Sequence, residues 1–198
     1  MFTGITQTTG TITQKKSRSD NKLCLRIKTD GPYFSDSQLG DSIMIDGVCL
    51  TIVSCHASWA QFDIMLPTCD ATIIKAYQLD QVVNLEKAML ASDRINGHIV
   101  LGHVDGTAEV VDQQMIEETT LLTIKPKDDN LMNQIVSKGA IAILGVSLTV
   151  VQATQNTFTI GLIPYTLTHT NLSNIQIGQV VNIETDILAK YISGGKND

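Results

Sequence analysis

The residues best suited to chemistry in this chain come in matched pairs, one member in each half. Cys49-Leu50-Thr51 in the first half corresponds to Ser147-Leu148-Thr149 in the second. Hydroxyl groups donate and accept hydrogen bonds, which suits an uncharged polar ligand, and a cysteine can react through its thiolate. The structural alternative is ordinary strand composition, because threonine favours strands and cysteine often serves as a small buried residue.

Two histidines follow glycines, in Gly97-His98 and Gly102-His103. Histidine titrates near neutral pH, which would suit His103 to carrying protons between reacting groups. No cysteine or glutamate stands at the spacing from them that zinc sites usually show, so we expect no metal. The remaining histidines, His56 and His169, are expected to be ordinary residues at the surface or at the edge of the core.

These residues belong to an internal repeat. Residues 42–53 (SIMIDGVCLTIV) and 140–151 (AIAILGVSLTVV) share seven of twelve positions and lie 98 residues apart. The same offset relates Val83-Asn84-Leu85-Glu86 to Val181-Asn182-Ile183-Glu184, and Gly4 to Gly102. Twice 98 is 196, close to the full length of 198. Two copies of this length indicate a tandem duplication of a small domain, and not a solenoid of many short units.

Both copies have the pattern of a small β-barrel. Short runs rich in Val, Ile, Thr and Phe alternate with turn residues, which predicts five or six strands per copy and a closed all-β barrel. The expected strands are residues 9–14, 22–28, 42–54, 60–65 and 81–87, then 106–112, 119–125, 140–152, 157–162 and 179–185. Asp46-Gly47 and Leu144-Gly145 interrupt the longest runs, where we expect a bulge or a close backbone approach. Helices are expected over 128–137 and 186–192.

Composition excludes several other classes of protein. The chain has a net charge of −6 and 5% aromatic residues, which opposes binding to a nucleic acid. No run approaches the ~20 apolar residues of a membrane span, and no glycine-rich dinucleotide fingerprint follows a strand. The four cysteines show no C-x-x-C spacing, so we expect free thiols and a cytoplasmic protein that binds no membrane.

The ordered motifs resemble those of the riboflavin synthase family, the lumazine-binding type. The first half carries Met1-Phe2-Thr3-Gly4-Ile5, Asp46-Gly47-Val48-Cys49-Leu50-Thr51 and Val83-Asn84-Leu85-Glu86. The second half carries Gly97-His98, Gly102-His103-Val104-Asp105-Gly106, Gly145-Val146-Ser147-Leu148-Thr149-Val150, Ile163-Pro164 with Thr166-Leu167, and Val181-Asn182-Ile183-Glu184. The resemblance covers residues 1 to about 192 in order, and the ordered set is more specific than any single motif.

The resemblance implies a fold and a reaction. The fold is two tandem six-stranded antiparallel Greek-key barrels over residues 1–95 and 96–186, with a short C-terminal helix and tail over 187–198. The reaction is the dismutation of two molecules of 6,7-dimethyl-8-ribityllumazine, in which one donates a four-carbon unit to the other and riboflavin forms. No cofactor or metal is implied. The implied partners are further copies of the chain in a homotrimer, and lumazine synthase.

The resemblance also assigns roles to residues. Ser42, Cys49, His103 and Asp186 correspond to groups linked to catalysis in the family. The implied substrate contacts are Gly4, Ile5, Thr6, Cys49, Leu50, Thr51, Asp63, Ile64, Met65, Thr68, Gly102, His103, Val104, Lys138, Ser147, Leu148, Thr149, Ile163, Pro164, Tyr165, Thr166, Leu167 and Thr168. Asp186 also suits the N-cap of the terminal helix, and the two roles are compatible. The family's site lies between the first barrel of one subunit and the second barrel of a neighbour.

Three features depart from the family pattern. Pro67 stands where an acidic residue is usual before Thr68, and Leu144-Gly145 replaces the usual Asp-Gly pair of the second barrel. If the missing carboxylate supports catalysis, turnover is slow; if it supports only a turn, little is lost. The C-terminal helix is short, which would weaken a trimer. The competing function is that of the family's non-catalytic antenna proteins, which bind one lumazine or flavin per chain; the polar residues kept in the second half favour the enzyme.

Overall fold

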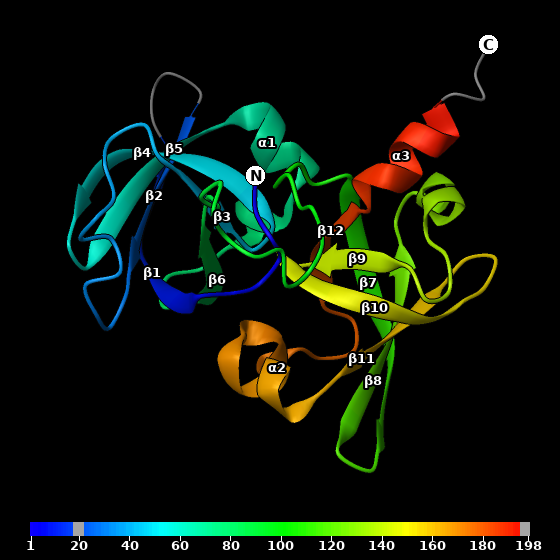
Figure 1. The fold of residues 1–198 in the computed structure, drawn as a ribbon. Coiled ribbons are helices and arrows are strands. Elements are labelled where there is room, and N and C mark those ends of the chain that lie inside the picture. Colours follow the sequence, from blue (N-terminus) through cyan, green and yellow to red (C-terminus); the bar gives the residue numbers. More distant parts are fainter. Residues whose placement is uncertain (18–21, 195–198) are drawn as a thin grey trace.

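The computed structural model describes residues 1–17 and 22–194, which form two closed antiparallel barrels of six strands each (Figure 1). The strands of the first barrel are β1 (Thr8–Ser17), β2 (Lys22–Lys28), β3 (Ser42–Ile45), β4 (Val48–His56), β5 (Trp59–Met65) and β6 (Val82–Lys87). Those of the second barrel are β7 (Gly106–Ile116), β8 (Thr119–Pro126), β9 (Ala140–Ile143), β10 (Val146–Ala153), β11 (Phe158–Leu162) and β12 (Val180–Thr185). The expected all-β fold of two tandem barrels is confirmed.

The strand order is the same in both barrels. It is β1-β2-β5-β4-β3-β6 in the first and, from the equivalent strand, β7-β8-β11-β10-β9-β12 in the second. The alternation of residue types along each strand explains why the sheet closes around a core. In β4, for example, Val48, Leu50 and Ile52 are buried, whereas the residues between them are not. Each barrel therefore encloses a hydrophobic core of its own.

The runs expected as single strands over 42–54 and 140–152 are each two strands joined by a tight turn. The backbone angle φ is 44° at Asp46 and 86° at Gly47, and it is 47° at Leu144 and 77° at Gly145. Two successive residues with positive φ form a hairpin turn whose twist matches that of the flanking strands. The expectation of a bulge is therefore wrong, because each glycine completes a hairpin.

The helices are short. The helix expected over 128–137 is only a 3₁₀-helix, η2 (Asp129–Gln134), because Ile135 is already extended and buried in the second core. The expected terminal helix is confirmed as α3 (Ile187–Gly194), and residues 195–198 of the expected tail lie outside the described residues. The structure adds α1 (Leu66–Ala71), η1 (Ile73–Ala76), α2 (Pro164–His169) and η3 (Asn171–Asn174). Within the described ranges, no helix is long and apolar enough to span a membrane.

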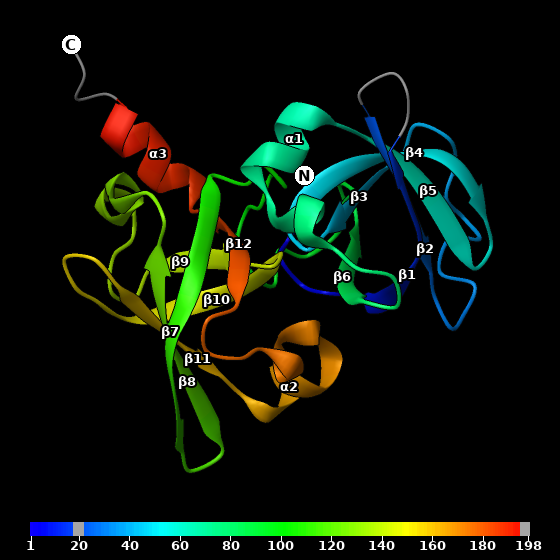
Figure 2. The ribbon, with the colours of Figure 1, turned by 180° about the vertical axis from the view of Figure 1, so that it is seen from behind.

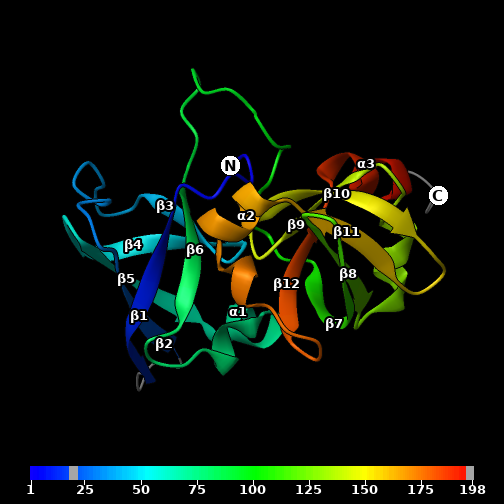
Figure 3. The same cartoon turned by 90° about the horizontal axis from the view of Figure 1, so that it is seen from below.

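The two barrels meet across their hairpin turns, in a contact that we call the seam. A Cβ atom on Gly47 would lie 3.0 Å from the nitrogen of Gly145, and one on Gly145 would lie 2.8 Å from the nitrogen of Gly47. The two glycines thus allow the close backbone approach that the sequence suggested. Beside the turns lies an apolar cluster of Phe2, Met44, Val100 and Ala142. The helices α1 and α2 flank the seam (Figure 2), and the connection between the barrels loops out beside the N-terminus (Figure 3).

Candidate ligand-binding sites

Two equivalent surfaces, the outer faces of β4 and β10, carry the paired residues found in the sequence. On β4, Cys49 is half-buried and Thr51 is exposed. On β10, Ser147 is half-buried and Thr149 is exposed. Ser42 of β3 pairs with Thr51, so its side chain lies on the same side of the sheet. We call these surfaces, with the segments that border them, the β4 face and the β10 face.

Each face is bordered by a glycine segment from elsewhere in the chain. The nitrogen of Cys49 donates to the carbonyl oxygen of Gly102 (2.9 Å), and that of Ser147 donates to the carbonyl oxygen of Gly4 (2.7 Å). A Cβ atom on Gly102 would lie 2.6 Å from the Cβ of Cys49, and one on Gly4 would lie 2.7 Å from the Cβ of Ser147. Both glycines also have a positive φ. Only glycine permits this approach, which places residues 102–104 at the β4 face and residues 4–6 at the β10 face.

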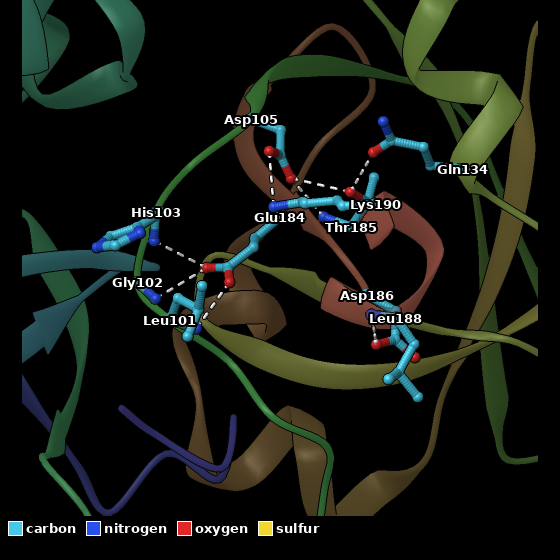
Figure 4. Close-up of polar contacts among 10 residues, drawn as sticks. All are labelled: Leu101, Gly102, His103, Asp105, Gln134, Glu184, Thr185, Asp186, Leu188 and Lys190. Carbon is cyan, nitrogen blue, oxygen red and sulfur yellow. Dashed lines mark hydrogen bonds and ion pairs between the residues drawn. The ribbon is translucent and has the colours of Figure 1, made fainter. Parts of the chain in front are cut away.

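A buried glutamate holds the segment at the β4 face. Glu184 of β12 accepts hydrogen bonds from the backbone nitrogens of Leu101, Gly102 and His103, at 2.7, 2.9 and 3.0 Å (Figure 4). Burial raises the pKa of this carboxyl, and the backbone hydrogen bonds act against that rise. The glutamate therefore fixes the path of the backbone on which the His103 side chain is exposed.

Glu86 of β6 does the same for the N-terminal segment. Its carboxylate accepts from the nitrogen and hydroxyl of Thr3 and from the nitrogen of Gly4, at 2.7, 2.8 and 3.0 Å. Burial raises the pKa of this carboxyl too, again opposed by the hydrogen bonds. Glu86 belongs to the first barrel and Ser147 to the second, so residues 3–5 bridge the two barrels. The sequence analysis missed both glutamates, although the repeated Val-Asn-x-Glu motif was the signal for them.

The β10 face contains a histidine that the sequence analysis left without a role. Nδ1 of His98 lies 2.7 Å from the hydroxyl oxygen of Ser147. The residue before it must be glycine, because a Cβ atom on Gly97 would lie 2.2 Å from the carbonyl oxygen of Thr3. Burial lowers the pKa of His98, against the attraction of Asp186. The imidazole is therefore neutral at neutral pH and can accept a proton.

Asp186 caps the terminal helix. Its Oδ1 accepts a hydrogen bond from the nitrogen of Leu188 at 3.0 Å, as an N-cap side chain does (Figure 4). The helix is also tied to the second barrel by the ion pair between Lys190 and Asp105, at 2.7 Å. Asp186 and His98 thus belong to the second barrel's side of the molecule, whereas Ser42, Cys49 and His103 belong to the β4 face. The expected catalytic residues do not meet at one point within the chain.

The helices α1 and α2 follow β5 and β11 and carry further candidates. Both have proline in the first turn, where no amide hydrogen is needed, which accounts locally for Pro67. Thr68 and Thr166 are half-buried at matching positions. The ring of Tyr165 stacks on that of His169, with 3.9 Å between their centroids. The large apolar side chains exposed here are Met65 (63%), Leu66 (42%), Ile163 (54%) and Tyr165 (67%).

Some expected contacts point into the cores. Leu50 and Ile64 belong to the first core and Leu148 to the second, and Leu167 packs against the second. The side chains of Leu50, Ile64 and Leu148 therefore point away from a ligand on an outer face, whereas that of Leu167 is half-buried. The other expected contacts are half-buried or exposed: Ile5, Thr6, Asp63, Val104, Lys138, Pro164 and Thr168.

Leu144 lies in the seam and on neither face. Its side chain is buried in the second core, and its carbonyl oxygen accepts a hydrogen bond from Nδ2 of Asn84 at 3.0 Å. The position where the family usually has a carboxylate is therefore part of the contact between the barrels. This placement favours the interpretation in which the residue supports a turn.

In the described part of the chain, no group of three or more histidine, cysteine, aspartate or glutamate side chains is placed to hold a metal ion. The polar groups of the two faces include hydroxyls, a thiol, two histidines and backbone amides. Such groups can orient an uncharged ring and move protons.

Known structures share this architecture. The crystal structure of LumP complexed with riboflavin matches the chain with a TM-score of 0.84 and 26% identity, over 93% of this chain and 99% of that one. The structure of LumP complexed with 6,7-dimethyl-8-(1'-D-ribityl) lumazine matches with a TM-score of 0.82, also at 26% identity and over the same shares of the two chains.

Sequence relatives cover the chain almost completely. It is 39% identical to riboflavin synthase of Actinobacillus pleuropneumoniae and 41% identical to that of Bacillus subtilis (strain 168), over 97% of this chain and 88% of each relative. The family model for the lumazine binding domain matches twice, over residues 3–88 and 101–186, once on each barrel. The chain therefore belongs to the lumazine-binding domain family.

Proposed function

We propose that this protein is a riboflavin synthase, which converts two molecules of 6,7-dimethyl-8-ribityllumazine into riboflavin and 5-amino-6-(ribitylamino)uracil. The observation that carries the proposal is the pair of matching faces. Each face is bordered by a glycine segment so close to β4 or β10 that one added Cβ atom would clash with the strand. A reaction between two copies of one substrate needs two related pockets. The curated relatives of nearly full length, which bear this name, support the same conclusion.

The chemistry asks for orientation and proton transfer. One substrate molecule gives its four-carbon unit to the other, and the atoms of the two substrates account for both products without a further reactant. Holding two reactants in the reacting geometry can lower the barrier by about 7–11 kcal/mol. The substrate's methyl group beside the ring iminium is acidic, so a modest base suffices. His98, acting through the Ser147 hydroxyl at 2.7 Å, is such a base on the β10 face.

The β4 face would bind the second substrate molecule. Ser42, Cys49 and His103 are the groups there that can assist proton transfer, and Thr51 and Thr68 can bind the ribityl hydroxyls. At the β10 face, Thr149 and Thr166 stand at the positions equivalent to Thr51 and Thr68, and Gly4 and Lys138 are the further expected contacts. Asp186 would act through the field that it exerts on His98.

We infer that the active assembly is a homotrimer in which the β4 face of one copy meets the β10 face of the next. Met65, Ile163 and Tyr165 are each more than half exposed in the single chain. On α3, Leu188, Tyr191 and Ile192 are 63%, 77% and 71% exposed. Exposed apolar side chains of this kind support contact with another copy. The free thiols of Cys49, Cys55 and Cys69 agree with a cytoplasmic location. Association with lumazine synthase stays a prediction.

Binding of lumazine or flavin without turnover is the competing function. The likeness to the LumP complexes favours it. The hydroxyls of Ser147, Thr149 and Thr166 oppose it, because they keep the second pocket polar.

The decisive experiment mixes the purified protein with 6,7-dimethyl-8-ribityllumazine and follows the absorbance of riboflavin. We expect turnover, two ligands bound per chain, and the mass of a trimer. Cys55→Ser is a matched control for Cys49→Ser, because Cys55 is a half-buried cysteine of the same strand with no assigned role. Tight binding of one lumazine per chain without riboflavin would establish the antenna function instead.

A further inference from the structure

At the seam, a carboxylate of the first barrel is bonded to the chain that follows the second barrel's α2. Asp46 is buried in its hairpin turn. Its Oδ1 accepts from the nitrogen of Asn84 (2.8 Å) and from Nδ2 of Asn171 (2.9 Å), and its Oδ2 accepts from the hydroxyl of Tyr77 (2.9 Å). A carboxylate with three donors forms strong hydrogen bonds, because the acceptor is charged or strongly polar.

Asn171 links this carboxylate to the segment that follows α2 in the second barrel. It opens η3, directly after α2 and Thr170. Its backbone nitrogen donates to Oδ1 of Asn84 at 2.8 Å, so both its backbone and its side chain are held by the first barrel. The hydroxyl of Thr170 donates to the carbonyl oxygen of Thr166 at 2.7 Å. A chain of bonds therefore runs from Asp46 to the helix that carries Tyr165 and Thr166.

The equivalent connection in the other direction is weaker. Asn182 accepts from the nitrogen of Ile73 at 2.9 Å, and the hydroxyl of Thr72 donates to the carbonyl oxygen of Thr68 at 2.7 Å. The backbone bonds are thus the same on both sides. The side-chain bond is not, because Ile73 stands at the position equivalent to Asn171, and Leu144 at that equivalent to Asp46.

We infer that Asp46 is a positioning residue for the ligand site of the second barrel, although it belongs to the first; this inference rests on the proposed function. Asp46 holds Asn171, and Asn171 fixes the end of α2, which directly follows β11, the strand paired with β10. After α1, Ile73 keeps the equivalent backbone hydrogen bond to Asn182, but its apolar side chain cannot donate to the other barrel. The asymmetry suits a reaction between identical molecules, in which one pocket must hold the donor and the other the acceptor. Contacts of this kind change affinity at a linked site by a few-fold to tens-fold.

The test uses Asn171→Ala, with Ile73→Ala as its matched control at the equivalent position. The probe is 6,7-dimethyl-8-ribityllumazine labelled with ¹³C in its ring methyl groups, because ligands in different barrels give separate NMR signals. Thr51→Ala and Thr149→Ala assign the signals to the β4 face and the β10 face. Asn171→Ala should raise the Kd of the β10-face ligand by about fivefold and leave the other within about twofold.

Two further variants separate positioning from a purely structural role. Ile73→Ala should lower the unfolding temperature. It should not produce the selective rise in the Kd of the β10-face ligand that is expected for Asn171→Ala. Asp46→Asn keeps an acceptor oxygen and should retain a β10-face Kd close to that of the unchanged protein, whereas Asp46→Leu should reproduce the Asn171→Ala effect. In turnover, Asn171→Ala should raise KM more than it lowers kcat.

Several results would overturn the inference. Equal weakening at both faces, weakening at the β4 face alone, or no change in either Kd each contradict it while leaving the proposed function intact. Binding of a single ligand at the β4 face in the unchanged protein contradicts it as well. Absence of lumazine binding at both faces of the unchanged protein contradicts the proposed function itself, and is thereby distinguished from the other results.

Discussion

The two sides of the seam share one backbone path and differ in chemistry. On the first barrel's side, Asp46, Tyr77 and Asn171 form a buried polar group joined by hydrogen bonds. The equivalent positions, 98 residues away, are Leu144, Ile175 and Ile73, which pack together against the second core. All three positions differ together because a mixed set would bury a polar group without a partner, at a cost of about 1–3 kcal/mol. The comparison shows that Leu144 belongs to a complete apolar set.

The hairpin turns sharpen the comparison. Asp46 and Leu144 both have positive φ, at 44° and 47°. Aspartate tolerates this conformation because its side chain bonds locally, whereas leucine does not. The burial of Leu144 in the second core offsets its backbone strain.

The largest expected effect on stability comes from placing the aspartate of the first barrel's turn at the equivalent position of the second. Leu144→Asp would bury a carboxylate beside isoleucines, and we expect a loss of about 3–5 kcal/mol in the free energy of unfolding, measured with urea. The triple variant Leu144→Asp, Ile73→Asn, Ile175→Tyr rebuilds the polar set and should recover part of that loss. A single variant as stable as the unchanged protein would refute this account of the seam.

Of the matched residues at the seam, only Asp46 should make stability depend on pH between about 4 and 8, because Leu144 at the equivalent position cannot ionise. Burial raises the pKa of Asp46 from 3.8 to about 7, against the hydrogen bonds from Asn84, Tyr77 and Asn171. The folded protein then binds more protons than the unfolded chain between these values, so this group's contribution to stability falls as pH rises from about 4 to 7. The fall is at most about 4 kcal/mol, at about 1.4 kcal/mol per pKa unit.

Urea unfolding from pH 4 to pH 8 measures this contribution. Asp46→Asn should remove it, so that the difference in stability between the two proteins changes over that range. Asp41→Asn is the control, because Asp41 is exposed. Parallel pH profiles of the unchanged protein and Asp46→Asn would contradict the expectation.

The two faces should respond differently to loss of their paired polar groups. Ser147→Ala breaks the bond to His98, and we expect kcat to fall about a hundredfold, the lower end of general acid–base effects. Cys49→Ser keeps a small polar group and should cost less. Since burial lowers the pKa of His98, the acidic limb of the kcat profile should lie below pH 6.5. An equal loss in both variants would show that the base is not confined to the β10 face.

The smallest expected effect concerns Lys138 and its equivalent, Gly40. Both have positive φ, at 67° and 94°. Lys138→Gly should stabilise the protein by about 0.5–1 kcal/mol, because the left-handed conformation costs lysine more than glycine. Thermal unfolding measures the gain, and Gly40→Lys is the reverse control. A rise in KM in Lys138→Gly would add evidence for the expected substrate contact.

Much of the fold was predictable from the sequence, because apolar and polar residues alternate along the strands of a barrel. The hairpin at Asp46-Gly47 was taken for an interruption within one strand, since the apolar pattern continues on both sides of it. The helices α1 and α2 were missed because six residues with a proline show no helical period. Their positions depend on where β5 and β11 end and on the hydrogen bonds that tie the following segments to the other barrel.

The site was predictable in part. The matched pairs and the paired glycines indicated the two faces, but spacing within a half says nothing about contacts between halves. The approach of Gly102 to Cys49 and of Gly4 to Ser147 therefore emerged only in three dimensions. His98 was passed over because only its contact with Ser147 distinguishes it from any other histidine.

Residues 3–5 and 101–103 each bind both barrels, and this exchange of arms bears on the origin of the duplication. If single barrels once paired as a dimer, the N-terminal segment of each copy would have bound the barrel of its partner, as in domain swapping. Fusion of the two genes would have made this exchange permanent, because each N-terminal segment is then tethered near the barrel that it binds, at a high effective concentration. Because Gly102 lies on the second copy and Cys49 on the first, neither half inherits a complete pocket, and the two pockets must evolve together.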